Sequence, residues 1–443
     1  MALKGLDIFK FTPKTNCKDC GIPTCMAFAM KVAQGAIGID KCPHLPPDAL
    51  EKLGEATAPP MKLIKIGVGD AEYSLGGETV LFRHEKTFVS KNLFAVNLRG
   101  DTIDQALPAI QHIDYERIGE RMYVELLNVE YSGDKTLFLE TVTKALTANR
   151  TMILEVSDPE AARAALELAG DRKPVLNGAN ISNYQDMNAL ASEFGVALGV
   201  SGAGLDAIYD TVKALEDLGN KNLIIDAGGA TIKETFANAV QIRRAAIKDG
   251  DRVFGYPAII NAAKLAPHDK NTQTALAALF TLKYASIIIM DGIDYAQALP
   301  LYGLRQNIYT DPQKPMKVEP GIYPLNGADE NAVCATTVDF ALTYFIISGE
   351  LERSGVPVNL LISDAGGYSV LTAWAAGKLS ASSITRFIRE KDIEGRIKNR
   401  NLIIPGKVAV LKGELEENLP GWKIIVAPNE AVGVVKFLKE LKV

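Results

Sequence analysis

Long hydrophobic runs, a strong net charge and dispersed cysteines are all missing from this chain of 443 residues. No window holds 18 uninterrupted apolar residues, and the first stretch, MALKGLDIFKFTPK, lacks the apolar core of a signal peptide. The formal net charge is -5, which gives no general attraction to nucleic acid or anionic lipid. We therefore expect a cytoplasmic protein whose partners include neither nucleic acid nor a membrane.

Cysteine is scarce, and four of the five lie between residues 17 and 42, while Cys334 is expected to be a small buried residue. In a reducing cytosol, clustered cysteines are more often metal ligands than disulfides. The spacing is C-x2-C-x4-C-x16-C-P, so three of the four are close together and one is remote: Cys17, Cys20, Cys25 and Cys42. Structural zinc usually has two short pairs, whereas three plus one followed by proline suits a cubane. We predict a [4Fe-4S] cluster, with zinc or unliganded thiols as the alternatives.

The segment CMAFAMKVAQG predicts a helix that begins near Cys25 and aims free N–H groups at the cluster. Lys14, Lys18 and Lys41 either add positive charge there or are solvated surface residues. His44, directly after the motif, is expected to be a surface residue rather than a ligand.

The length predicts more than one domain. Residues 1–57 form the cluster domain and end at TAPP, which indicates a linker. Residues 58–92 form a joint with two short strands, MKLIKIGVGD and TVLFRHEKTF. Residues 93–325 and 326–443 are then two further domains.

Residues 93–325 repeat a short apolar run, a polar or glycine-bearing loop and an amphipathic helix. Eight runs occur: LFAVNL, YVELLNV, TMILEVS, PVLNGA, VALGVS, NLIIDAGG, VFGYPA and SIIIMDG. Continuous apolar runs are typical of parallel strands covered by helices on both faces. We therefore predict a (β/α)8 TIM barrel, although a doubly wound open sheet has a similar pattern.

Polar residues follow several of these runs, at the strand ends where barrel sites lie: Asn97, Asn128, Glu155, Asn177, Asp226 and Asp291. Asparagine and aspartate are also ordinary helix caps, so we favour capping over catalysis. No pair stands out as acid and base, and we predict no catalytic residue.

Residues 326–443 alternate helix and strand, as in a small Rossmann or flavodoxin-like domain. TTVDFALTYFIISGELERSG is predicted to be helical, and PVNLLISDAGG a strand followed by a glycine turn. The loops SDAGGYS and IPGK follow apolar strands, which is where open α/β sheets bind ligands.

The opening DIFKFTPKTNCKDCGIPTCMAFAMKVAQG, followed by a barrel and a terminal α/β domain, closely resembles the large subunit of the corrinoid iron-sulfur protein of the reductive acetyl-CoA pathway. The resemblance covers essentially the whole chain. It implies a methyl carrier, whose corrinoid Co(I) accepts methyl from methyltetrahydrofolate through a separate methyltransferase and donates it to acetyl-CoA synthase/CO dehydrogenase. It also implies a small partner subunit, and a cluster that reduces Co(II) again.

The resemblance implies that the four clustered cysteines bind the cluster. It implies corrinoid contacts at Thr337, Thr343, Gly367, Tyr368, Ser369, Val370, Pro405, Gly406, Asn429 and Ala431. None of the four histidines, at 44, 84, 112 and 268, lies in the last domain, so that domain cannot supply a histidine ligand to a base-off cobalt. Two rival functions are a barrel methyltransferase acting directly on methyltetrahydrofolate and an iron-sulfur electron carrier without corrinoid.

Overall fold

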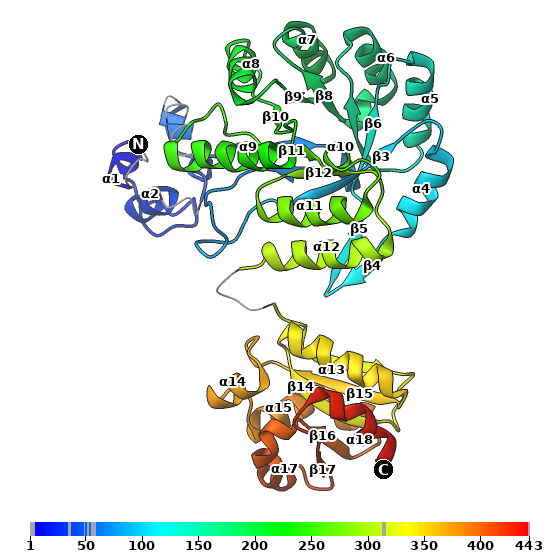
Figure 1. Ribbon diagram of the computed structural model, residues 1–443. Helices are drawn as coiled ribbons and strands as arrows, with labels where there is room; N and C mark the ends of the chain where they lie inside the picture. The colour runs from blue at the N-terminus through cyan, green and yellow to red at the C-terminus, as the bar shows by residue number, and fades with distance from the viewer. Residues whose placement is uncertain are drawn as a thin grey trace. The chain divides into compact units, whose positions relative to one another are not determined.

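The computed structural model describes residues 5–33, 37–47, 49–50, 53–54, 59–311 and 316–441. The chain divides into two compact units, Met1–Tyr309 and Thr310–Val443 (Figure 1). The predicted boundary between residues 57 and 58 lies outside the described residues, and the one between 325 and 326 falls inside the second unit. Within the described residues, no helix has the length and apolar character needed to cross a bilayer.

A closed barrel of eight parallel strands forms most of the first unit, which confirms the predicted TIM barrel. Each strand pairs with its neighbours in chain order, and the last pairs with the first. The strands are β3 (Leu93–Leu98), β6 (Leu126–Glu130), β7 (Thr151–Glu155), β8 (Val175–Ala179), β9 (Ala197–Val200), β10 (Leu223–Asp226), β11 (Ala258–Asn261) and β12 (Ile287–Met290).

Helices surround the barrel strands (Figure 1). They are α4 (Ile103–His112), α5 (Lys135–Ala145), α6 (Pro159–Ala169), α7 (Tyr184–Phe194), α8 (Leu205–Asp217), α9 (Ile232–Arg244), α10 (Ala262–Leu265), α11 (Lys270–Leu282) and α12 (Tyr295–Ile308), with short turns η3 (Gly170–Arg172) and η4 (Ala245–Asp249). Aspartate or threonine caps several of them: the side chains of Asp134, Asp158 and Thr231 accept backbone N–H bonds at the starts of α5, α6 and α9.

Most of the predicted runs coincide with barrel strands because both faces of each strand are buried. The run VFGYPA is the exception, since β11 begins only at its last residue, Ala258. A hairpin that the pattern did not predict, β4 (Asp114–Arg117) and β5 (Glu120–Tyr123), lies between β3 and β6. Its strands are rich in charged residues and only Met122 among them is fully buried, so they give no apolar run.

The joint between the cluster segment and the barrel contains one two-stranded sheet, β1 (Ile64–Ile66) with β2 (Tyr73–Leu75), and the turn η2 (Gly69–Ala71). The strand predicted in TVLFRHEKTF is wrong, since residues 79–88 contain none. Ile64, Ile66 and Leu75 join the barrel core, and Thr151 at the start of β7 donates a hydrogen bond to Ala71 O over 2.5 Å. This joint is therefore packed against the amino-terminal end of the barrel.

The cluster segment contains α1 (Gly5–Phe9), α2 (Cys25–Ala33) and the turn η1 (Ile39–Lys41). Its small core is separate from that of the barrel and includes Ile8, Phe28, Val32, Ile39 and Cys42. Gly5 lies against α2, since a Cβ there would be 2.4 Å from Met30 Sδ.

The second unit is built on a five-stranded sheet in the order β13-β15-β14-β16-β17. The strands are β13 (Gly321–Leu325), β14 (Val333–Val338), β15 (Val358–Ser363), β16 (Asn401–Ile404) and β17 (Lys423–Val426), and only the edge strand β13 is antiparallel. The strand that follows β14 in the chain, β15, pairs with one side of β14. The next parallel strand, β16, pairs with the other side of β14. The strand order therefore reverses between β14 and β16.

Helices cover both faces of this sheet. One core, with Leu351, Val434 and Leu438, joins it to α13 (Ala341–Ser354) and α18 (Val434–Glu440), and another, with Ile384, Ile388 and Leu415, joins it to the remaining helices. The latter are α14 (Val370–Ala375), α15 (Ala381–Glu390), α16 (Ile393–Arg396), η5 (Gly406–Leu411) and α17 (Lys412–Asn418), and η6 (Ala431–Gly433) precedes α18.

The helix predicted over residues 336–355 begins too early. Residues 336–338 are the last residues of β14, and α13 starts at Ala341. The β-branched residues Thr336, Thr337 and Val338 favour the strand because they are fully enclosed by its neighbours.

A buried ion pair holds α12 to the barrel wall. Arg305 Nη1 donates to Glu125 Oε1 over 2.6 Å and to Asn92 O over 2.9 Å, and Glu125 Oε2 accepts the Phe94 N–H. Both side chains are only 4% exposed. We predict that Arg305→Met lowers the free energy of unfolding by about 3–5 kcal/mol, because it leaves a buried carboxylate without its cation.

Urea unfolding measures this loss, and the double variant Glu125→Met/Arg305→Met is the control. Replacing both partners removes the unpaired charge, so the double variant is expected to be more stable than the single one. A single variant as stable as the wild type contradicts the prediction.

Candidate functional site

The four clustered cysteines lie around one small region of the first unit. Cys25 and Cys42 are buried, Cys20 is half-buried and Cys17 is exposed. Burial raises the pKa of the Cys42 thiol, a hydrogen bond from the His44 backbone lowers it, and the nearby Cys20, Cys25 and Cys17 raise it. Thiolates this close repel one another unless a positive metal centre lies between them, so this donor set fits a metal cluster.

Helix α2 begins at Cys25, which confirms the predicted helix start. The expectation that its first N–H groups are free is wrong for two of them. The Cys25 N–H donates to Asn16 Oδ1 over 2.8 Å, and the Ala27 N–H donates to Thr24 Oγ1 over 3.1 Å. These side chains fix the start of α2 instead.

The loop before α2 has an unusual backbone. Lys14, Asn16 and Lys18 all have positive φ, at 60°, 51° and 70°. Lys14 Nζ lies 5.7 Å from the centre of the Phe9 ring, and Lys41 pairs with Asp40 over 3.7 Å. The left-handed residues Asn16 and Lys18 make the chain turn sharply on both sides of Cys17.

His44 is half-exposed, as expected, but it is not isolated. Its Nε2 lies 2.6 Å from Asp19 Oδ2, and the ligand atoms of Cys17, Asp19 and His44 all lie within 4.8 Å of one another. The hydrogen bonds from His44 and from Cys17 lower the pKa of Asp19. The contact between His44 and Asp19 joins the first and the last part of the cysteine motif in the cluster segment.

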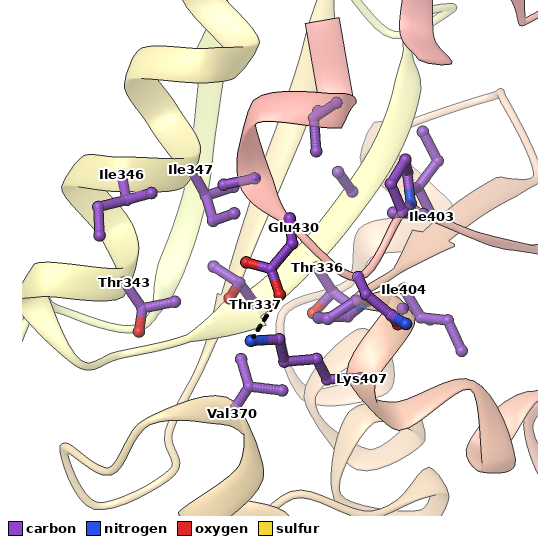
Figure 2. A pocket seen from close by; sticks show the side chains of 18 of the residues that line it. Thr336, Thr337, Thr343, Ile346, Ile347, Val370, Ile403, Ile404, Lys407 and Glu430 are labelled. Carbon is purple, nitrogen blue, oxygen red and sulfur yellow. Dashed lines mark ion pairs between the residues drawn. The ribbon is translucent and has the colours of Figure 1, made fainter. Parts of the chain in front are cut away.

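A cavity of about 320 Å³ lies in the second unit at the carboxyl ends of β14 and β16, where the strand order reverses (Figure 2). Thr343, Ile346 and Ile347 of α13 lie on one side, and Ile403 and Ile404 lie at the end of β16 (Figure 2). Lys407 Nζ pairs with Glu430 Oε1 over 3.3 Å at the wall. The wall is therefore largely apolar, with one ion pair.

Eight of the ten predicted corrinoid contacts line this cavity: Thr337, Thr343, Ser369, Val370, Pro405, Gly406, Asn429 and Ala431. Gly367 and Tyr368 belong to the same loop as Ser369 but are not among the lining residues that the structure describes. Sequence reasoning missed the apolar side of the wall, including Ile346, Ile347 and Leu371. Their spacing on α13 and α14 is that of ordinary core residues, so the sequence has no signal for them.

Two features show that the cavity is suited to a ligand. The hydroxyls of Thr336 and Thr337 are buried and have no hydrogen-bond partner within the protein. Gly406 lets the chain pass close to the next loop, since a Cβ there would lie 2.3 Å from Ala427 O and 2.8 Å from Asn429 Oδ1. Buried polar groups normally have partners, so the two hydroxyls are available to a ligand.

Comparison with known proteins gives matches over almost the whole chain. The sequence model of the family described as CO dehydrogenase/acetyl-CoA synthase delta subunit matches residues 63–438, and a model of an Fe-S cluster segment matches residues 13–44. The corrinoid/iron-sulfur protein large subunit of Moorella thermoacetica is 38% identical over 99% of both chains. The acetyl-CoA decarbonylase/synthase complex subunit gamma of Methanothermobacter thermautotrophicus is 34% identical, over 100% of this chain and 99% of that one.

The chain belongs to the family of corrinoid/iron-sulfur protein large subunits. The Fe-S match contains all four clustered cysteines, so this family member has an iron-sulfur segment at residues 13–44. The relatives' names place the family in the acetyl-CoA pathway, as subunits of a larger complex.

The six polar residues predicted at the strand ends lie together at one mouth of the barrel. None of them is the N-cap of a described helix, so the predicted capping role is wrong. Asn128 Nδ2 donates to Asn97 Oδ1 and Glu155 Oε2, both over 2.8 Å. Asn97 in turn donates to Asp291 over 3.2 Å. The barrel mouth is thus a hydrogen-bonded polar network.

The other side of the mouth contains a carboxyl group in a costly position. Asp226 accepts from Asn177 Nδ2 over 3.2 Å and from the Gly228 N–H over 3.1 Å. Burial raises the pKa of Asp226, the charge of Glu155 raises it further, and the two hydrogen bonds lower it. Glu155 is itself paired with Lys264. The ionised form of Asp226 is therefore disfavoured in the folded protein.

Asp226→Asn tests this electrostatic cost. Because the pKa of Asp226 is higher in the folded than in the unfolded protein, Asp226 contributes stability when the pH is below the pKa of an aspartate in the unfolded chain. This contribution is lost as the pH rises through the pKa of Asp226 in the folded protein. Asp226→Asn does not lose stability in this way. The thermal midpoint of the variant minus the thermal midpoint of the wild type should therefore increase from pH 4 to pH 7. Midpoints measured in parallel at each pH give this difference, and a decrease with rising pH contradicts the assignment.

Proposed function

We propose that this chain is a methyl-group carrier. Its second unit holds a base-off corrinoid, and its first unit holds a [4Fe-4S] cluster. When bound, the corrinoid would supply a cobalt whose Co(I) state accepts the methyl group and is regenerated when the methyl group leaves as a methyl cation equivalent, and the cluster would supply the electron that returns Co(II) to Co(I). The methyl group comes from methyltetrahydrofolate through a separate methyltransferase and goes to acetyl-CoA synthase/CO dehydrogenase.

The cavity at the strand reversal is the observation that carries this proposal. Open α/β sheets bind ligands outside the carboxyl ends of the strands where the strand order reverses, and the order β15-β14-β16-β17 supports a flavodoxin-like domain over residues 326–443. Eight of the ten corrinoid contacts that the family resemblance implies lie on its wall. Thr336 and Thr337 would donate or accept hydrogen bonds to the ligand, and the apolar side chains would exclude water from it.

In the cluster domain, Cys17, Cys20, Cys25 and Cys42 would supply the four thiolates. Cys42 and Cys25 would hold the cluster on the buried side, while Cys17 leaves one side near solvent, where electrons can enter or leave. Asn16 and Thr24 orient the start of α2, so they fix the position of Cys25.

The lack of histidine in the second unit agrees with a base-off corrinoid. An axial nitrogen stabilises Co(II) over four-coordinate Co(I). A domain that supplies no imidazole therefore makes reduction easier, which is what a cluster-driven repair step requires.

A partner subunit would cover part of the corrinoid. The cavity, at about 320 Å³, is much smaller than a corrinoid, so most of the cofactor would lie on the surface of the unit. Exposed apolar side chains lie at the cavity wall and next to it in the sequence: the lining residues Ile346 and Leu371, and Leu342 on α13, Trp374 on α14 and Val432 on η6. We propose that the small subunit of the corrinoid iron-sulfur protein packs here, giving a cytoplasmic heterodimer.

A second candidate function is a methyltransferase acting directly through the barrel. The observation that favours it is the polar mouth, where Asn177 Oδ1 and Asn128 Oδ1 are buried without partners. Titration of the chain with methyltetrahydrofolate separates the two, because the carrier needs no tight site for this substrate. Tight binding, abolished by Asp226→Asn, supports the methyltransferase.

Cys20→Ala tests whether the cluster and the methyl transfer are separate functions. The variant should lose the cluster absorption and the reductive activation of cobalt. It should keep methyl transfer from chemically reduced Co(I), because the thiolates only hold the cluster. The matched control is Cys334→Ala, since Cys334 is fully buried in the second unit. Loss of methyl transfer in folded Cys20→Ala supplied with Co(I) contradicts the proposal.

The partner surface gives a second prediction. The small subunit should tighten binding of hydroxocobalamin to the chain, and Leu342→Glu should reduce that effect, since Leu342 is 58% exposed and lies outside the cavity wall. Leu168→Glu, an exposed site on α6 of the barrel, should behave as the wild type. Equal affinity with and without the small subunit contradicts the shared interface.

A further inference from the structure

A buried carboxylate that the proposed function does not use lies behind the corrinoid cavity. Asp339 directly follows β14, the strand whose last residues line the cavity, and its side chain is 0% exposed. Asp339 Oδ1 accepts the N–H groups of Ala365 and Gly367, both over 3.0 Å. Oδ2 accepts the Gly367 N–H over 3.1 Å and lies 3.3 Å from Lys317 Nζ.

These bonds hold one short segment, the loop of residues 364–369 that follows β15. Gly366 and Gly367 have φ of 73° and 76°, so two consecutive residues are left-handed, a conformation that glycine adopts without strain. Asp364 accepts the Gly366 N–H over 3.0 Å and lies 3.5 Å from Lys317 Nζ. The backbone of the loop is thus arranged around the Asp339 carboxylate.

Packing anchors this loop at Ala365, which is 1% exposed and belongs to a core of the second unit, while both ends of the loop line cavities. Its end, at Ser369 and the adjoining Val370, lines the corrinoid cavity. Its start, at Asp364 and Gly366, lines a second, polar cavity of about 540 Å³. Away from Ala365 the position of the loop depends on its hydrogen bonds, and those to the charged acceptor Asp339 are the strongest kind.

We propose that Asp339 is a positioning residue for the corrinoid. Its carboxylate fixes the loop of residues 364–369, and through it sets Ser369 and Val370 at the cavity wall. Asp339 does not touch the cofactor, and this role rests on the proposed function of the cavity. The step is one of binding and orientation only, so no bond or electron is transferred.

The test measures the affinity of the full chain, with its small subunit, for hydroxocobalamin together with the thermal midpoint of the cofactor-free protein. Asp339→Ala removes the acceptors of both loop N–H groups, and we expect it to weaken binding by about tenfold or more. Asp339→Asn keeps the side-chain size and one acceptor oxygen, so its affinity for hydroxocobalamin should lie between that of the wild type and that of Asp339→Ala. If Asp339→Ala does not fold, Asp339→Asn decides the matter in the same way.

Asn359→Ala is the matched control. Asn359 is 4% exposed, lies on β15 of the same sheet and donates to Asp329 O over 2.8 Å, but it does not contact the loop. It should lower the thermal midpoint without changing the affinity.

A folded Asp339 variant that binds hydroxocobalamin as tightly as the wild type overturns the positioning role. An equal loss of affinity in Asn359→Ala also overturns it, since the effect is then a general loosening of the sheet. No binding by the wild type overturns the proposed function itself, and the positioning role with it.

Discussion

Parallel pairing of the strands is the constraint on which both units depend. It places the carboxyl ends of neighbouring strands at one edge, so residues far apart in the sequence meet there. In the barrel this edge brings together Asn97, Asn128, Glu155 and Asp226. In the second unit the same edge brings Thr337 at the end of β14 close to the loops after β16 and β17.

The two edges differ in how their polar groups are satisfied. In the barrel mouth, most of the polar side chains bind one another, and the ion pair of Lys264 with Glu155 crosses the opening. In the second unit, Thr336 and Thr337 are buried without partners beside a largely apolar cavity. Asn128 and Asn177 in the barrel mouth also leave one oxygen each without a partner, but their amide nitrogens are bound. The two threonine hydroxyls have no partner at all and lie beside an apolar cavity, so the second edge is the better binding site. Under the proposed function, the barrel serves chiefly as a scaffold that carries the cluster segment.

The sequence predicted the strands of the barrel well because strands buried on both faces give uninterrupted apolar runs. It failed where local preference and environment disagree. The Asp114–Arg117 and Glu120–Tyr123 hairpin is rich in charged residues and only partly buried, and the end of β14 continues directly into a helical pattern. The edge strand β13 contains Gly321 and Pro324, which are poor strand formers, and it is paired on one side only.

For the sites, the cysteine spacing was sufficient to locate the iron-sulfur segment, because four thiolates in one short stretch have few other uses. The resemblance then located eight of the 21 residues that line the cavity. Asp339 was missed, since the sequence placed it inside a predicted helix over residues 336–355 and not at the end of a strand. Only the three-dimensional structure shows that its carboxylate binds a loop more than 20 residues further along the chain.

The central claim is that one chain carries both a cluster and a corrinoid. The most direct measurement is the visible absorption spectrum of the chain purified anaerobically with its small subunit, combined with its iron and cobalt content. The account predicts distinct corrinoid bands on the broad cluster absorption, with about four iron atoms and about one cobalt atom per chain. Iron without cobalt, from a protein produced in cells that make corrinoid and not restored by added hydroxocobalamin, would contradict it.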